Sequence, residues 1–384
     1  MSKETFDQAN VDVQATRVEP MAPEEFDFEA YADYESSLLE RCQTFWTAES
    51  AVLVYRRMRV AEVFSYGCKD MKASLQWQLG ALHKSMRFKA DIPNFLEPWY
   101  GIGTVAGAFR ADYTWKENQA PAMRPKFKSV SDALAYSAVP VAQSRIGKHT
   151  LDMIDYFIEK TDGRLPMSLT DTQSPLDIAG NIVDMNSFFL DMIDRPDEVT
   201  LLLNRMTDLL TDFTRVQINH VGEGSHKAGS QALVWPGHGF ASSRCFEGLG
   251  MSDDNALMIS QPHYRQFSAP ATSAAGKPFG GSAFHCCGNW SNKIEQVMQI
   301  SGLKMVDGAF SAATDPSPNP PEPFAQAFVN TGIVVNARIV GGPETIADIV
   351  RRLFKPGMKL IVVTYCQAPE EQAAAYDRIY EICS

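Results

Sequence analysis

Short apolar runs alternate with helical segments over the C-terminal two thirds of this chain. The clearest helix begins at Pro196, behind the capping residue Asp194, and its apolar residues recur every three or four positions as far as Val216. Runs typical of strands stand between such helices, at 165–171, 232–235, 282–284, 303–306, 332–335 and 359–364. Strands that alternate with helices need crossover connections, so the pattern predicts an α/β protein with a parallel sheet.

One more run, at 93–98, brings the predicted strands to seven, and the position of an eighth stays open. No glycine fingerprint opens a helix after a strand, because Gly101-Ile102-Gly103 lacks the third glycine that dinucleotide binding requires. We therefore predict a (β/α)8 TIM barrel with a helical N-terminal extension, and a doubly wound open sheet is the second choice. The predicted boundaries are an arm over 1–35, a helical lead-in over 36–90 that packs on the barrel, and the barrel itself over 91–384.

Within this lead-in, the sequence favours one long helix from about residue 36 to residue 64. Three arginines, Arg56, Arg57 and Arg59, would then lie on its solvated face, where they could meet an acidic partner. A second helix is predicted from 177 to 193, a third from 344 to 355, and the last begins at Pro369.

Charge and cysteine usage limit the function classes. With 35 basic and 46 acidic residues the formal net charge is −11, which disfavours nucleic-acid partners because phosphate contacts need clustered basic residues. No run approaches the length of a membrane helix, and the first residues lack a signal-peptide profile, so we expect a cytoplasmic protein. Seven cysteines, an odd number in a long chain, do not form a disulfide framework.

Metal-type ligands follow two of the predicted strands. His285 and Cys287 lie two positions apart in an extended segment, so they project to one side while Cys286 faces the other. Cys366 ends another hydrophobic strand, and active sites of barrels lie where strands end. Two thiolates and one imidazole would make a three-ligand zinc site with an open position, the pattern of catalytic zinc. The alternative is that these cysteines only pack as small buried side chains.

The segment His285-Cys286-Cys287-Gly288, followed by Cys366, resembles the His-x-Cys…Cys zinc signature of the methyltransferase branch of the uroporphyrinogen decarboxylase superfamily. The segments 170–177 and 252–264 are also similar to that family, and the resemblance extends over about residues 90–384. The arginine- and glycine-rich signature of the true decarboxylases is not visible, and neither is a corrinoid-binding motif.

This resemblance implies a barrel enzyme that moves a methyl group between a small molecule and a corrinoid protein. The expected cofactors are Zn²⁺, held by His285, Cys287 and Cys366, and a cobalamin carried by a partner protein that docks at the barrel mouth. The small molecule could be a methoxylated or methylated compound or a thiol, and the donor, the acceptor, the direction of transfer and the fourth zinc ligand stay open. A homodimer is one possible oligomeric state, and the sequence does not decide it.

Other polar residues at predicted strand ends are candidates for supporting roles. Asp171 and His238 are predicted catalytic residues; Glu97, Tyr100 and Asp307 are predicted to bind substrate. Asp307 could instead orient a ligating imidazole or supply the fourth zinc ligand.

Two rival functions are kept. One is a metal-free decarboxylase of the same superfamily, which would need arginines clustered near the barrel mouth. The other is a non-catalytic barrel with a structural zinc, in which loss of the metal would unfold the protein.

Overall fold

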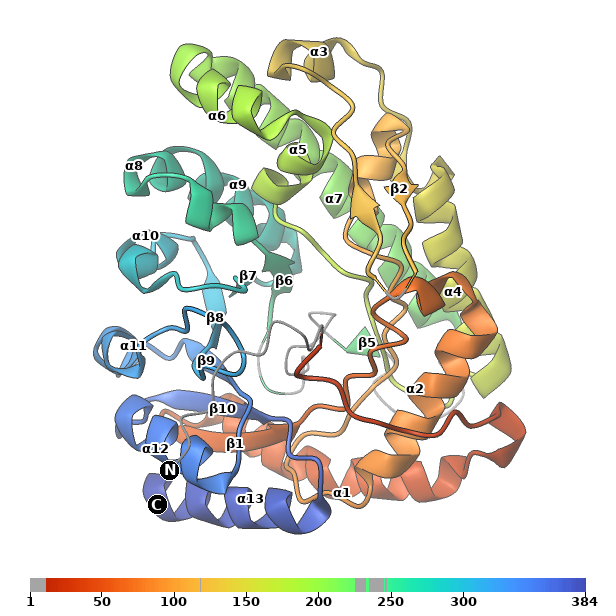
Figure 1. Cartoon of the computed structure of the whole chain (residues 1–384), viewed down its shortest axis with the longest axis vertical. Helices are drawn as coiled ribbons and strands as arrows, with labels where there is room; N and C mark the ends of the chain where they lie inside the picture. The colour runs from red at the N-terminus through yellow and green to blue at the C-terminus, as the bar shows by residue number, and fades with distance from the viewer. Residues whose placement is uncertain (1–11, 118, 225–232, 235–244, 246) are drawn as a thin grey trace.

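Parallel strands and strand-like segments surround the centre of the molecule (Figure 1). The computed structural model describes residues 12–117, 119–224, 233–234, 245 and 247–384. Six strands form one parallel sheet in the order β1-β10-β9-β8-β7-β6. These strands are β1 (Ala51–Arg56), β6 (Leu249–Ser252), β7 (Ser282–His285), β8 (Leu303–Ala309), β9 (Val334–Ile339) and β10 (Lys359–Thr364).

Two further segments lie between β1 and β6. The amide of Asp91 donates to the carbonyl of Val54 in β1 at 2.8 Å, and Leu96 forms a parallel bridge with Met167 of β4 (Met167–Ser168). Beyond β4, Gln173 forms a parallel bridge with Ser252 of β6. The sheet and these two segments together occupy the eight strand positions of a (β/α)8 barrel, so the predicted fold is confirmed.

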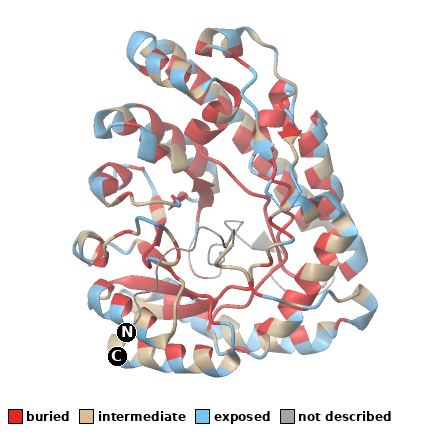
Figure 2. Cartoon of the chain, viewed as in Figure 1, coloured by how far each residue is buried: buried red, intermediate tan, exposed pale blue. Residues whose placement is uncertain are grey.

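Helices surround these strands on the outside (Figure 1). Figure 2 shows the strands as buried and the outward helix surfaces as exposed or intermediate. The short strands β2 (Tyr113–Thr114) and β3 (Ala122–Met123) form a separate antiparallel pair, and β5 (Leu233–Val234) pairs with β4. The helices are α1 (Phe28–Thr47), α2 (Met71–Ser85), α3 (Val130–Ala135), α4 (Arg145–Thr161), α5 (Pro175–Ile182), α6 (Met185–Asp194), α7 (Pro196–Gly224), α8 (Gln261–His263), α9 (Ala269–Gly276), α10 (Ile294–Val297), α11 (Pro321–Phe328), α12 (Pro343–Leu353) and α13 (Pro369–Cys383).

Side chains that alternate along the strands fill the barrel interior. Leu53, Met305, Ile361 and Val363 belong to one buried cluster, and Phe45 of α1 packs into the same cluster. Helix α1 thus lies against the amino-terminal ends of the strands, where the Lys359 ammonium also donates to the carbonyl of Trp46 at 2.9 Å. Because this end is covered by α1, the polar side chains at the carboxyl ends of the strands form the accessible face.

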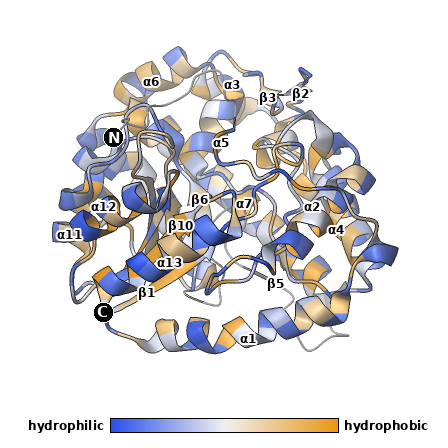
Figure 3. Cartoon of the chain, turned by 60° about the horizontal axis from the view of Figure 1, so that its bottom comes forward, coloured by the Kyte–Doolittle hydropathy of each residue, from blue (hydrophilic) through white to orange (hydrophobic). Residues whose placement is uncertain are grey.

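The predicted helix over 36–64 is wrong in its second half. Helix α1 ends at Thr47, and β1 begins at Ala51 and pairs in register with β10. Val52, Val54 and Tyr55 favour a pleated strand, and Figure 3 shows β1 as hydrophobic. The first barrel strand therefore lies inside the predicted lead-in, while the domain boundaries themselves stay a prediction.

The predicted helix over 177–193 is two helices, α5 and α6. Val183 and Asp184 have extended backbone between them, and Asp184 caps α6 by accepting a hydrogen bond from the amide of Ser187 at 3.1 Å. Among the helices within the described ranges, none has the length and apolarity to cross a membrane.

Candidate metal centre

Three side chains with metal-type donors meet at the carboxyl ends of β6 and β7. They are Asp254, His285 and Cys287, and their ligand atoms all lie within 4.8 Å of one another. The Nε2 atom of His285 lies 3.3 Å from the Sγ atom of Cys287, and the Cys287 amide donates to Asp254 Oδ1 at 2.7 Å. Cys286 points the other way, into the apolar layer under the helices, as strand alternation predicts. Imidazole, thiolate and carboxylate are all zinc ligands, so this group fits that ion.

Asp307 of β8 holds the other side of the imidazole. His285 and Asp307 are register partners, and a one-residue irregularity near the start of the β7–β8 pairing places them opposite each other. The Nδ1 atom of His285 donates to Asp307 Oδ2 at 2.6 Å, which leaves Nε2 facing Cys287. Arg338 and Asn336 of β9 also donate to the Asp307 carboxylate, at 2.9 and 2.6 Å. Such a carboxylate fixes the ring orientation of a ligating histidine.

The charges around His285 stabilise one another. Burial by itself raises the pKa of Asp307, but Arg338 and His285 outweigh it and lower this pKa to about 2. Burial by itself lowers the pKa of His285, but Cys287 and Asp307 outweigh it and raise that pKa to about 10. The Asp307 carboxylate contacts His285, Asn336 and Arg338, and its side chain is fully buried, which favours an orienting role over the predicted contact with substrate.

Cys366 is not in the three-donor group. It follows β10, its side chain is only 2 % exposed, and burial raises the pKa of its thiol to about 12. A thiol binds metal as the thiolate, so the environment of Cys366 in this conformation favours the form that does not bind. Its role as a zinc ligand stays a prediction.

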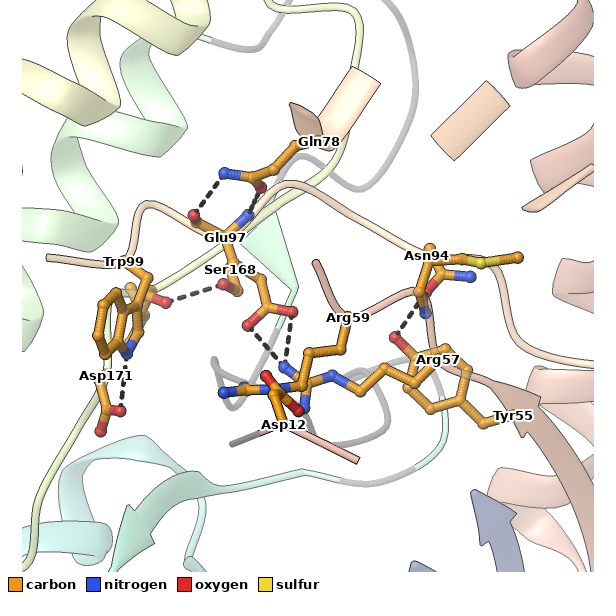
Figure 4. A network of polar contacts seen from close by, with 12 residues as sticks. Asp12, Tyr55, Arg57, Arg59, Gln78, Asn94, Glu97, Trp99, Ser168 and Asp171 are labelled. Atoms are coloured by element: carbon orange, nitrogen blue, oxygen red, sulfur yellow. Dashed lines mark hydrogen bonds and ion pairs between the residues drawn. The ribbon is translucent and has the colours of Figure 1, made fainter. Parts of the chain in front are cut away.

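The sequence predicts the three arginines at 56, 57 and 59 on a solvated helix face, but Arg56 ends β1 and Arg57 and Arg59 follow it. Arg56 and Arg57 are buried at the mouth of the barrel, where Arg57 donates to both carboxylate oxygens of Glu97 at 3.1 and 3.2 Å (Figure 4). Arg59 forms a 2.7 Å ion pair with Asp12. Glu97 is thus the partner of an arginine, and its predicted contact with substrate stays untested.

The remaining predicted residues are distributed around the mouth. Asp171 is buried and accepts a hydrogen bond from Trp99 Nε1 at 3.0 Å (Figure 4). It also accepts one from Gln173 Nε2 at 2.8 Å. Tyr100 stacks on His149 with ring centroids 3.8 Å apart, so its ring packs against another side chain of the mouth. His238 lies outside the described residues.

Asp171 makes the folding stability depend on pH. Burial raises its pKa to about 6, against about 3.9 for an unfolded aspartate, so the native state binds more protons between these values. Stability from this group is therefore present below pH 4 and is lost as the pH rises towards 6. Asparagine does not titrate, so Asp171→Asn lacks this pH dependence. We therefore expect the free energy of unfolding of the variant, relative to that of wild type, to be about 2–3 kcal/mol higher at pH 7 than at pH 4. Urea unfolding of both proteins at the two pH values measures this, and a pH-independent difference would contradict it.

Asp254 was not predicted as a ligand. It lies in the turn after β6, in the segment 252–264 that was noted only for its family resemblance. The position of Asp254 follows from the parallel pairing of β6 with β7, because the residues after two neighbouring parallel strands meet at one edge of the sheet. The sequence predicts no strand at 249–252 and so does not place Asp254 beside His285 and Cys287.

Comparison with known proteins agrees with this architecture. The family model described as "Uroporphyrinogen decarboxylase (URO-D)" matches residues 45–224, a segment that includes β1 and ends before His285. A solved methyltransferase from Methanosarcina mazei has a TM-score of 0.58 at 13% sequence identity, covering 91% of this chain and 99% of that chain. No curated protein sequence matches. The chain is thus similar to this family over residues 45–224, and it shares the fold of the methyltransferase.

Proposed function

We propose that the protein is a zinc-dependent methyltransferase that moves a methyl group between a small molecule and a corrinoid protein. The observation that carries the proposal is the group of Asp254, His285 and Cys287 at the carboxyl ends of the strands, with its imidazole oriented by Asp307. The similar fold of a protein named as a methyltransferase supports the reaction class. Direction, donor and acceptor follow from the experiments below.

In this proposal His285, Cys287 and either Asp254 or Cys366 hold the ion. A zinc ion bound there would stabilise a substrate thiol as thiolate or act as a Lewis acid on an ether or thioether. Asp307 keeps the Nδ1 proton of His285, so that Nε2 is the ligating atom. The backbone of Cys287 holds Asp254 beside the thiol.

Exposed apolar side chains lie next to this group and support docking of a partner over the mouth. Leu257 and Met258 follow Asp254 in the same turn and are 37% and 66% exposed. Large exposed apolar side chains in one place are typical of an interaction surface. The corrinoid of the partner would have to reach the ion from this side, because α1 covers the opposite end of the barrel.

The decarboxylase remains a second candidate because arginines do cluster at the mouth. Arg57, Arg59 and Arg338 each follow or end a barrel strand. Each of them, however, already has an acidic partner, in Glu97, Asp12 and Asp307 respectively. Their charge is therefore largely neutralised, which makes them weaker sites for substrate carboxylates than free arginines would be.

Metal analysis and the cobalt spectrum together test the proposal. The protein purified with zinc is incubated with cob(I)alamin or methylcobalamin and a panel of methoxylated aromatics, methylamines and thiols. We expect a change of the cobalt spectrum that stops when a chelator removes zinc, while the fold is retained. A change of the cobalt spectrum that is insensitive to the chelator would refute the zinc dependence. No change with any methyl donor or thiol would leave the decarboxylase as the candidate, and unfolding on zinc removal would favour a structural site.

Cys366→Ser tests the third predicted ligand. If Cys366 ligates zinc, we expect the bound metal and the methyl-transfer rate to fall together, because serine replaces a thiolate with a weak hydroxyl ligand. Zinc content is measured by elemental analysis after dialysis. Full zinc retention together with normal activity would remove Cys366 from the site and leave Asp254 as the third ligand.

A further inference from the structure

A short N-terminal segment crosses the mouth of the barrel above β1 and β10. We call residues 12–17 the strap. Ala15 forms a parallel bridge with Arg59, the amide of Thr16 donates to the Arg59 carbonyl at 2.7 Å, and the Asp12 carboxylate pairs with the Arg59 side chain at 2.7 Å. The strap therefore lies along the segment that follows β1.

The strap separates two cavities. One has a volume of about 630 Å³ and is lined by Phe64 and Trp77 among others; the second, about 650 Å³, reaches Cys366. Asp12, Ala15 and Arg17 line both. Lifting the strap would therefore remove part of the wall of both cavities, including the one that reaches Cys366.

The same strap holds the segment that carries Cys366. The guanidinium of Arg56 donates from Nε to the Cys366 carbonyl and from Nη2 to Thr16 Oγ1, both at 2.8 Å. The side-chain amide of Gln367 donates to the carbonyl of Ala15 at 3.1 Å. The side chains of Arg56 and Gln367 thus connect the strap to the backbone around Cys366. The position of the Cys366 thiol depends on this backbone.

The chain is anchored firmly just after the strap. The amide of Met21 donates to the carbonyl of Gln76 in α2, and a side chain at Gly80 would meet the carbonyl oxygen of Glu19 at 1.9 Å. Within the strap, by contrast, the contacts above are polar and only Thr16 is buried. Segments with little apolar burial open locally at low cost, so the anchor at α2 acts as the fixed end of a movable strap.

We propose that the strap is a gate for Cys366. While the strap lies on Arg59 and Gln367, the thiol stays shielded and outside the three-donor group. When the strap lifts, the segment after β10 is released and Cys366 becomes free to join His285 and Cys287. This inference rests on the proposed function for the ligand role of Cys366, but the gating itself does not require a metal.

Alkylation of the metal-free full-length protein tests the gate. Wild type, Asp12→Asn and Gly80→Ala are treated with iodoacetamide at neutral pH, and each cysteine is followed by mass spectrometry. Asp12→Asn removes the ion pair, and Gly80→Ala places a methyl group against the strap's anchor. In each variant we expect Cys366 to be alkylated about tenfold faster, which corresponds to about 1.4 kcal/mol of lost contact energy.

Controls separate local opening from unfolding. Asp377→Asn breaks a surface ion pair with Lys89 and should leave the Cys366 rate unchanged. Cys42, buried in α1, reports global unfolding and should keep its wild-type rate. An unchanged Cys366 rate in both strap variants, or a parallel rise at Cys42, would overturn the gate.

Zinc then distinguishes the gate from the ligand role. Added to Asp12→Asn, zinc should slow alkylation of Cys366 but not of Cys383, which lies at the end of α13. Fast alkylation without zinc protection would refute Cys366 as a ligand in the proposed function and leave the gate standing. Protection without faster alkylation in the metal-free variants would refute the gate alone.

Discussion

Asp307→Ala is expected to lower the free energy of unfolding by about 3–5 kcal/mol and zinc affinity by about 10–100-fold. The stability loss arises because Arg338, which is buried beside Asp307, would lose its acidic partner. The affinity loss has a separate cause, since His285 would lose the carboxylate that orients its ring. Urea unfolding and zinc competition against a chromophoric chelator measure the two effects.

A double variant separates these two causes. In Asp307→Ala/Arg338→Met the uncompensated charge is absent, so much of the stability should return. Zinc affinity should remain low, because the double variant still has no group to accept the Nδ1 proton of His285. Recovery of affinity together with stability would show that Asp307 acts on the fold alone and does not orient the imidazole.

Cys287→Ser is expected to reduce zinc affinity by at least about 100-fold, because a thiolate ligand next to an imidazole is replaced by a hydroxyl. The adjacent Cys286→Ser is the matched control. Its side chain lies in the apolar layer under the helices, so serine there should cost about 1–3 kcal/mol of stability through an unsatisfied hydroxyl. Zinc affinity in the control should stay near wild type.

Both variants are compared by zinc competition and by thermal unfolding of the metal-free proteins. If Cys286→Ser loses zinc as strongly as Cys287→Ser, the prediction that only Cys287 faces the metal is wrong. If neither variant changes affinity, the ion is bound elsewhere.

The sequence predicts those parts of the site that follow one strand. Alternation along 284–287 places His285 and Cys287 together and Cys286 apart, and the structure has this arrangement. β10 was also predicted with its observed bounds, because a run of β-branched residues between a glycine stop and a loop has few other interpretations.

Contacts between distant strands were harder to predict. β1 is a run of only six residues that begins shortly after α1, and an apolar run of that length does not distinguish strand from helix. Its misassignment moved Arg57 to a solvated surface, whereas the pairing of β1 with β10 buries it beside Glu97. Asp254 was missed for the same reason, since its place depends on β6 lying next to β7.

The irregularity in the pairing of β7 and β8 determines which residue of β8 lies opposite His285. Ser282 faces Leu303, but Ala283 faces Met305, so one residue of β8 is skipped before His285 meets Asp307. Without that extra residue His285 would lie opposite Val306, whose side chain packs under the helices. A one-residue insertion or deletion at this point of the barrel would therefore make or break the contact that orients the His285 imidazole. It would do so without replacing any residue of the site.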